Sequence, residues 1–200
     1  DDRALLGKLY AGGPELRLRQ EWLLGVGGVR LLRAIGIEPA AWHANEGHAA
    51  FMLIERMREL LVRGVGLDEA VRQVRAASVF TTHTPVAAGH DVFGADQLAA
   101  CAGALWDEMG ISREAFMRLG RHPQAQGESF HMTAAAIRLS RRVNGVAQSH
   151  GVVVDLDGHV GAPPQPDFAG DLHDPARAVA VGLVVGPLEA ALQVVPPHKR

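Results

Sequence analysis

The 200-residue sequence has little cysteine and no long apolar run. Its single cysteine, Cys101, has no partner for a disulfide within the chain, which excludes a disulfide scaffold and favours a reducing compartment. No stretch approaches the roughly 20 consecutive apolar residues of a membrane span, and residues 1–3 precede no apolar run of the kind found in signal peptides. We therefore expect a soluble, cytoplasmic protein.

Lysine is scarce as well, because of the 20 basic residues only Lys8 and Lys199 are lysines. Any chemistry that needs a buried lysine, such as Schiff-base formation, has almost no candidate here. The formal net charge is −2 at pH 7, which gives no electrostatic reason to expect nucleic acid or an anionic membrane as a partner. Apolar residues make up 48% and charged residues 21%, the balance of a globular protein.

The spacing of apolar residues, caps and breakers predicts an α/β domain. In chain order we expect a helix over 14–34, an extended segment over 40–44, a helix from the N-cap Asn45 to about 61, a helix over 69–76 capped by Asp68, and a strand over 78–82. This strand–helices–strand order is a βαβ-type unit with parallel strands. Further helices are expected near 95–109, 112–119 and 130–143, with Asn144-Gly145 as a helix stop and residues 146–147 opening a strand.

The character of the sequence changes near Gly151. Seven of the 11 prolines follow that residue, together with valine-rich runs at 152–154 and 179–185. This tail lacks both the charge of a solvated helix and a clear alternation of strands and turns. Three interpretations stay open: a disordered extension, a hydrophobic edge that needs a partner, and sequence foreign to the fold.

Two histidine-bearing turns are the candidate site. The first spans residues 43–48 (HANEGH), at the carboxyl end of the expected extended segment, and the second spans 81–85 (TTHTP), at the carboxyl end of the next strand. Because ligands bind beyond the carboxyl ends of parallel strands, both turns should face one crevice. Imidazole, carboxylate and hydroxyl groups donate to and accept from a polyhydroxylated ligand, and N–H groups at a helix start add donors.

These histidines and Cys101 also have alternative roles. One histidine at a strand end is more often structural than functional, but two in one crevice make the two readings about equal. A zinc site is not favoured, because His43 and His48 lie five positions apart rather than four. Cys101 lies in an alanine-rich helical stretch without an evident base, so a cysteine nucleophile is not favoured either. The residues alone indicate a polar-ligand site in an α/β domain.

Four blocks carry a family resemblance: residues 20–30 (QEWLLGVGGVR), 42–51 (WHANEGHAAF), 80–91 (FTTHTPVAAGHD) and 139–147 (LSRRVNGVA). In order and spacing they resemble the α-glucan (glycogen/maltodextrin) phosphorylase family, particularly its bacterial and archaeal branch, over residues 1–151. The resemblance implies part of a Rossmann-like domain of a GT-B type glycosyltransferase, namely the later portion of the N-terminal domain. Residues 152–200 match nothing in the family, and a shifted reading frame or a fusion is one hypothesis for their origin.

The resemblance also implies an activity. Family members transfer a glucosyl unit of an α-1,4-glucan to inorganic phosphate, release glucose 1-phosphate, and are often homo-oligomeric. They use pyridoxal phosphate, whose 5′-phosphate exchanges a proton with the substrate phosphate. Neither Lys8 nor Lys199 lies in a matching motif, so the cofactor lysine is expected outside this chain, and the isolated chain is expected to be inactive.

Site residues follow from the same motifs. His83 matches the histidine whose backbone carbonyl contacts the glucosyl unit at the reacting bond, so it is assigned to catalysis and substrate binding. Asn45, Glu46, His48 and Thr84 are assigned to substrate binding, and no residue here is assigned to the cofactor or to a metal. Where the branch carries an acidic gating residue, this chain has Gly12-Gly13-Pro14. Two alternatives stay open: a non-catalytic glycan-binding or regulatory remnant, and a nucleotide-sugar transferase of the same fold.

Overall fold

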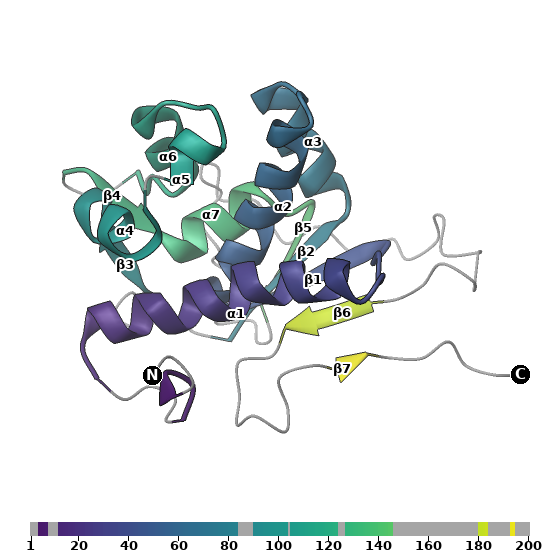
Figure 1. The fold of residues 1–200 in the computed structure, drawn as a ribbon, viewed down its shortest axis with the longest axis horizontal. Helices are drawn as coiled ribbons and strands as arrows, with labels where there is room; N and C mark the ends of the chain where they lie inside the picture. The colour runs from purple at the N-terminus through teal and green to yellow at the C-terminus, as the bar shows by residue number, and fades with distance from the viewer. Residues whose placement is uncertain are drawn as a thin grey trace, which may run out of the picture.

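Parallel strands form the centre of the computed structural model, which describes residues 4–7, 12–83, 90–103, 105–123 and 127–145, and the backbone of 180–183 and 193–194. The main sheet has the order β5-β2-β1-β6-β7 (Figure 1). Strands β1 (Ala41–Asn45), β2 (Ser78–Thr82), β5 (Arg142–Gly145) and β6 (Ala180–Leu183) are parallel, and β7 (Gln193–Val194) is antiparallel to β6. The predicted α/β class and the parallel β1–β2 pair are confirmed.

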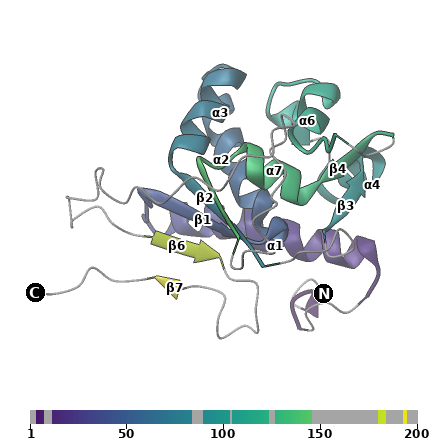
Figure 2. The same ribbon diagram turned by 180° about the vertical axis from the view of Figure 1, so that it is seen from behind.

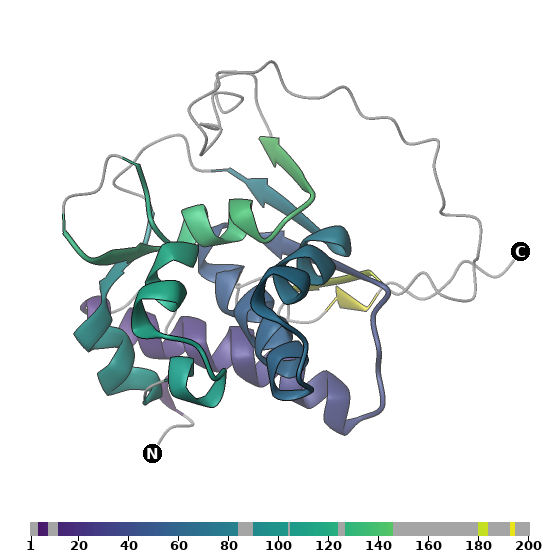
Figure 3. The ribbon, with the colours of Figure 1, turned by 90° about the horizontal axis from the view of Figure 1, so that it is seen from above.

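The helices pack on the sheet from one side. Viewed from behind in Figure 2, strands β1, β2 and β6 lie in front of α1 (Pro14–Ala34) and α2 (Ala50–Val62). Seen from above in Figure 3, the teal segments α4 (Ala95–Ala102), α5 (Leu105–Glu108) and α6 (Arg113–Leu119) lie to one side of the sheet. Among the described residues, none of the helices combines the length and apolar character needed to cross a membrane.

Helix α1 has the bounds that the sequence predicts, with Pro14 in its first turn, and its glycines explain how it meets α2. A Cβ atom on Gly25 would lie 2.6 Å from the Cβ of Phe51 and 2.8 Å from the backbone nitrogen of Met52, so only glycine fits there. On Gly27 the nearest atom would be a flexible leucine methyl at 3.5 Å. The close contact of α1 with α2 therefore requires glycine at position 25 but not at position 27.

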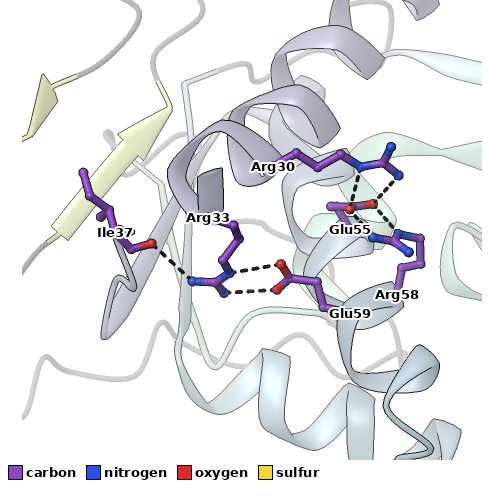
Figure 4. A network of polar contacts seen from close by, with 6 residues as sticks. All are labelled: Arg30, Arg33, Ile37, Glu55, Arg58 and Glu59. Carbon is purple, nitrogen blue, oxygen red and sulfur yellow. Dashed lines mark hydrogen bonds and ion pairs between the residues drawn. The ribbon is translucent and has the colours of Figure 1, made fainter. Parts of the chain in front are cut away.

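Ion pairs join α1 to α2 beside this contact (Figure 4). Glu55 on α2 is fully buried and accepts from Arg30 Nε on α1 and from Arg58 Nε, each at 2.8 Å. Burial alone would raise the pKa of Glu55, but the hydrogen bonds from the two arginines lower it below its ordinary value. Arg33 and Glu59 form a second, bidentate pair at 3.0 Å. The two helices are thus held by charged groups as well as by the apolar core.

The start of α2 differs from the prediction. Asn45 is not an N-cap but the last residue of β1, where it pairs with Thr81 of β2. A short 3₁₀ turn, η2 (Gly47–Ala49), follows Glu46, and α2 begins at Ala50. Pairing with β2 keeps the chain extended through Asn45, so the helix starts only once the chain has left the sheet. Similarly, α3 (Leu67–Ala76) begins before Asp68, with Gly66 as its N-cap.

The predicted helix over 130–143 is wrong at both ends. The chain instead forms β4 (Ser129–His131), α7 (Met132–Arg138) and then β5, which contains Asn144 and Gly145. Pairing of β5 with β2 satisfies backbone groups that a helix would otherwise bond, and so overrides the helix-stop signal. Strand β3 (Val92–Gly94), which pairs with β4, was not predicted. The expected strand at 146–147 lies outside the described residues.

Between these strands the helical predictions hold with one interruption. The expected helix over 95–109 is split into α4 and α5 by Gly103, whose φ of 63° is a conformation that suits glycine. Helix α6 follows Ser112, whose hydroxyl accepts from the backbone N–H of Ala115 at 3.1 Å as an N-cap. The strand predicted over 78–82 is β2, and it is confirmed.

Candidate functional site

The two histidine-bearing turns meet at the adjoining carboxyl ends of β1 and β2. The imidazole Nε2 of His83 lies 2.9 Å from the amide Oδ1 of Asn45. The Glu46 carboxylate accepts the backbone N–H of His83 through Oε1 and the hydroxyl of Thr82 through Oε2 at 3.3 Å. Three of the predicted site residues, Asn45, Glu46 and His83, are therefore in direct contact although almost 40 positions separate the two turns. Thr84 lies outside the described residues.

His43 lies within β1, two residues before Asn45 at the end of the strand. Its Nε2 lies 2.8 Å from the hydroxyl of Thr81 on β2. Burial, and secondly the neighbouring His83, lower the pKa of His43. The ring is accordingly a neutral group that links the two strands just below the site.

His48 lies in η2 and is only 8% exposed. Burial, and next the positive charge of Arg17, lower its pKa to about 4, so the imidazole is neutral at neutral pH. Its Nε2 is buried and makes no hydrogen bond within the part of the chain that the structure describes. A neutral imidazole nitrogen that lacks a partner either donates or accepts, depending on the tautomer, and is suited to a ligand hydroxyl.

A second group of charged side chains, absent from the sequence-based site, lies beside His48. Arg17 on α1 contacts Glu21 Oε1 through Nε at 2.7 Å and Asp91 Oδ2 through Nη2 at 3.1 Å. Arg17 and Asp91 both act on the pKa of His48, which places the group next to the η2 turn. Sequence reasoning missed these residues because Arg17 and Asp91 are 74 positions apart. The one available signal was Glu21, a charged residue among the buried positions of α1.

Three further histidines gather where β3, β4 and α7 meet. The ring centroid of His131 lies 5.4 Å from that of His90 and 5.0 Å from that of His122. His131 also caps α7, since its Nδ1 accepts the N–H of Ala134 at 3.4 Å. Burial, and secondly the neighbouring histidines, lower the pKa of His131 to about 4. Among the described residues no group of histidine, cysteine or acidic side chains has the arrangement of a metal site.

The described side chains of this site are groups that form hydrogen bonds. Neutral imidazoles, an amide and carboxylates converge on one edge of the sheet, and together they offer both donors and acceptors. The described ranges contain no lysine, so nothing in them fits a cofactor held as a Schiff base.

Comparison with known proteins places this arrangement in context. No family profile matches the chain. The chain is 41% identical over 153 residues to the maltodextrin phosphorylase of Thermococcus litoralis, covering 76% of this chain and 18% of the relative. It is 33% identical over 149 residues to the glycogen phosphorylase of Aquifex aeolicus, and 39% identical over 168 residues to that of Mycobacterium tuberculosis. These two matches cover 74% and 76% of this chain, but 22% and 19% of the relatives, so the chain spans about a fifth of their length.

Proposed function

Over about three quarters of its length this chain belongs to the family of glycogen and maltodextrin phosphorylases, and we propose that it is a segment of an α-1,4-glucan phosphorylase. The reaction is transfer of a terminal glucosyl unit of the glucan to inorganic phosphate, which yields glucose 1-phosphate. Residues 1–151 then form part of a Rossmann-like domain of the GT-B arrangement, in a cytoplasmic and often oligomeric enzyme. The parallel sheet with its helices supports this assignment. Residues 152–200 are proposed to be an unmatched tail.

The observation that carries the proposal is the contact between the two turns. Asn45 and Glu46 bind His83 at the edge of the sheet where ligands bind in open α/β folds. In the proposed enzyme His83 contacts the glucosyl unit at the bond that breaks, and Asn45, Glu46, His48 and Thr84 bind the same sugar. The unpartnered Nε2 of His48 supports this role, because a sugar hydroxyl supplies the missing hydrogen bond.

Fixed donors and acceptors of this kind serve catalysis by orientation. Phosphorolysis develops positive charge on the sugar ring, and a site with prearranged carboxylate and carbonyl oxygens stabilises that charge without reorganising. The carboxylates of Glu46 and Asp91 give this edge of the sheet such oxygens, and Arg17 offsets part of the charge of Asp91. The chain thus supplies the recognition of the sugar.

The cofactor is proposed to be held elsewhere in the enzyme. Pyridoxal phosphate supplies the phosphate group that exchanges a proton with the substrate phosphate, and its lysine is proposed to lie outside this chain. We accordingly expect the purified 200-residue chain to form no glucose 1-phosphate from maltodextrin and phosphate. We also expect it to show no pyridoxal absorbance. Formation of glucose 1-phosphate by the pure chain would contradict the proposal that the cofactor is held outside this chain.

The assignment to a phosphorylase is tested at the level of the gene. Sequencing the encoding DNA across the codon of Gly151, with translation in all three frames, examines the point at which family-like sequence stops. The proposal predicts that one frame continues with phosphorylase-like sequence as far as a pyridoxal-binding lysine. If the present reading frame is confirmed and no phosphorylase-like sequence follows in any frame, the enzyme assignment is wrong. The alternative, a glycan-binding remnant, would then be the function to test.

A further inference from the structure

Glu46 has a backbone conformation that favours glycine. Its φ is 66° and its ψ is 163°, and it is the one non-glycine residue with positive φ in the described ranges. An L-residue is strained in this region because its Cβ crowds the backbone. The following residue, Gly47, is glycine for a different reason: a Cβ there would lie 2.4 Å from the hydroxyl oxygen of Thr133. The sequence therefore places a glutamate at the strained position, although glycine suits it better.

The strained residue is bound both to the end of β2 and to the η2 turn that follows it. Its backbone N–H donates to the carbonyl of Thr81 at 2.8 Å, and its own carbonyl accepts from the N–H of Ala49 at 3.1 Å. Its carboxylate accepts from the Thr82 hydroxyl and from the His83 N–H. The bonds made by the backbone do not require a glutamate. The bond to the His83 N–H does, because it needs an acceptor on a side chain of this reach.

His83 is an exposed residue just beyond the last residue of β2, so the sheet itself does not fix it. Its two anchors in the described structure are the Glu46 carboxylate on its backbone N–H and the Asn45 amide on its imidazole. A charge-assisted hydrogen bond to the backbone is the stronger kind of anchor. Without it, His83 would keep only the contact of its ring.

We propose that Glu46 is a positioning residue, which uses its strained backbone to direct its carboxylate onto the His83 N–H and so fixes the main chain of His83 at the site. The inference rests on the proposed function for its purpose, since His83 is the residue assigned to the sugar. The clamp itself is a property of this chain and is measurable without any ligand. It also explains why glutamate, rather than glycine, occupies a position that glycine suits better.

The test uses the 200-residue chain with two variants, Glu46→Gly and Glu46→Gln, and Glu38→Gly as a control at an exposed carboxylate outside the regular elements. Amide hydrogen exchange is followed by NMR. In Glu46→Gly we expect the His83 amide to exchange about tenfold faster or more, since a hydrogen bond to a charged group is lost. The Phe80 amide inside β2 should keep its rate. Glu46→Gln retains an acceptor without charge, so its effect should be smaller and in the same direction.

Two results would overturn the clamp. One is an unchanged His83 exchange rate in both variants, and the other is faster exchange throughout β2, which would indicate a role in general stability. If Glu46→Gly fails to fold, the Glu46→Gln variant decides the question. Affinity for maltoheptaose, measured on the same samples, should fall in Glu46→Gly and remain unchanged in Glu38→Gly. A parent chain that binds no maltoheptaose would contradict the proposed function, while the exchange rates still decide the clamp.

Discussion

Arg17 Nε lies 2.7 Å from Oε1 of Glu21, a carboxyl group whose side chain is only 2% exposed. The geometry is that of an ion pair, whereas burial, and secondly the charge of Asp91, raise the pKa of Glu21 to about 9. We infer that Glu21 is protonated, because the single positive charge of Arg17 is shared between two carboxyl groups, those of Glu21 and Asp91. The side chain of Glu21 then donates a hydrogen bond to Asp91.

The protonated Glu21 predicts a loss of stability at alkaline pH. Its pKa is raised from 4.5 in the unfolded chain to about 9 in the fold. Between pH 4.5 and 9 the native state therefore keeps a proton on Glu21 that the unfolded chain has lost. Stability from this group is complete below pH 4.5 and is lost as pH rises to 9, by about 1.4 kcal/mol per pH unit at most. Glu21→Gln, a neutral isostere, should remove the decline. Thermal unfolding from pH 6 to 9.5 measures it, with the exposed Glu15→Gln as control; equal alkaline declines in the parent and Glu21→Gln would contradict the assignment.

The cap of α7 predicts the opposite dependence in acid. His131 has a pKa of about 4 in the fold against 6.5 in the unfolded chain, because burial first, and then His122 and His90, lower it while Asp91 opposes them. Its contribution is present above pH 6.5 and is lost as pH falls toward 4. Asn is a good N-cap that does not titrate, so His131→Asn should flatten this acid decline. His131→Ala, which removes the cap, should be less stable at every pH; an acid decline that is the same in His131→Asn and the parent would show that the cap does not cause it.

The α1–α2 contact predicts contrasting effects for two neighbouring glycines. Gly25→Ala forces a methyl group against the backbone of Phe51 and Met52, and should destabilise the fold by about 1–3 kcal/mol. Gly27→Ala meets only a leucine methyl at 3.5 Å, and should stabilise by roughly 0.5–1 kcal/mol through helix propensity. Urea unfolding of both variants measures the difference. Equal effects of the two substitutions would show that α1 and α2 are not in close contact at Gly25.

Loss of the buried carboxylate between α1 and α2 should be costly. Glu55→Gln leaves Arg30 and Arg58 without their anion, and we expect a loss of about 2–4 kcal/mol in the free energy of unfolding. The matched control is Glu69→Gln, which breaks the exposed pair with Arg72 and should change stability by less than about 0.5 kcal/mol. Similar losses in both variants, measured by urea unfolding, would contradict the importance of burial at Glu55.

Local signals explain which parts of the fold could be predicted from sequence. The Pro14 start and apolar spacing of α1, and the β-branched run of β2, depend on neighbouring residues, so both elements were predicted with their bounds. Strands β3, β4 and β5 have three or four residues each and exist because a distant segment pairs with them. No periodicity shows in so short a run, so a helix was predicted where β5 begins.

The candidate site divides in the same way. The order of strands and turns in the sequence was enough to predict that His83 lies near Asn45 and Glu46, because the carboxyl ends of neighbouring parallel strands adjoin. The Glu21–Arg17–Asp91 group depends on how α1 lies across the η2 turn, which no local pattern specifies. The strain at Glu46 could not be predicted either. The neighbouring glycine is residue 47, where it does not relieve the positive φ of residue 46.

The most direct test of the account is an NMR titration of the 200-residue chain with maltoheptaose, with the β-linked cellohexaose as a control sugar. An α-glucan site predicts saturable shifts of residues 45–48 and 81–83 with maltoheptaose alone. His83→Ala should weaken this binding, because it removes the ring contact that holds His83 against Asn45. The apolar contact of α1 with α2 around Gly25 should show no shifts. An absence of saturable shifts at the two turns, or identical titrations with both sugars, would contradict the assignment of this edge of the sheet to an α-glucan.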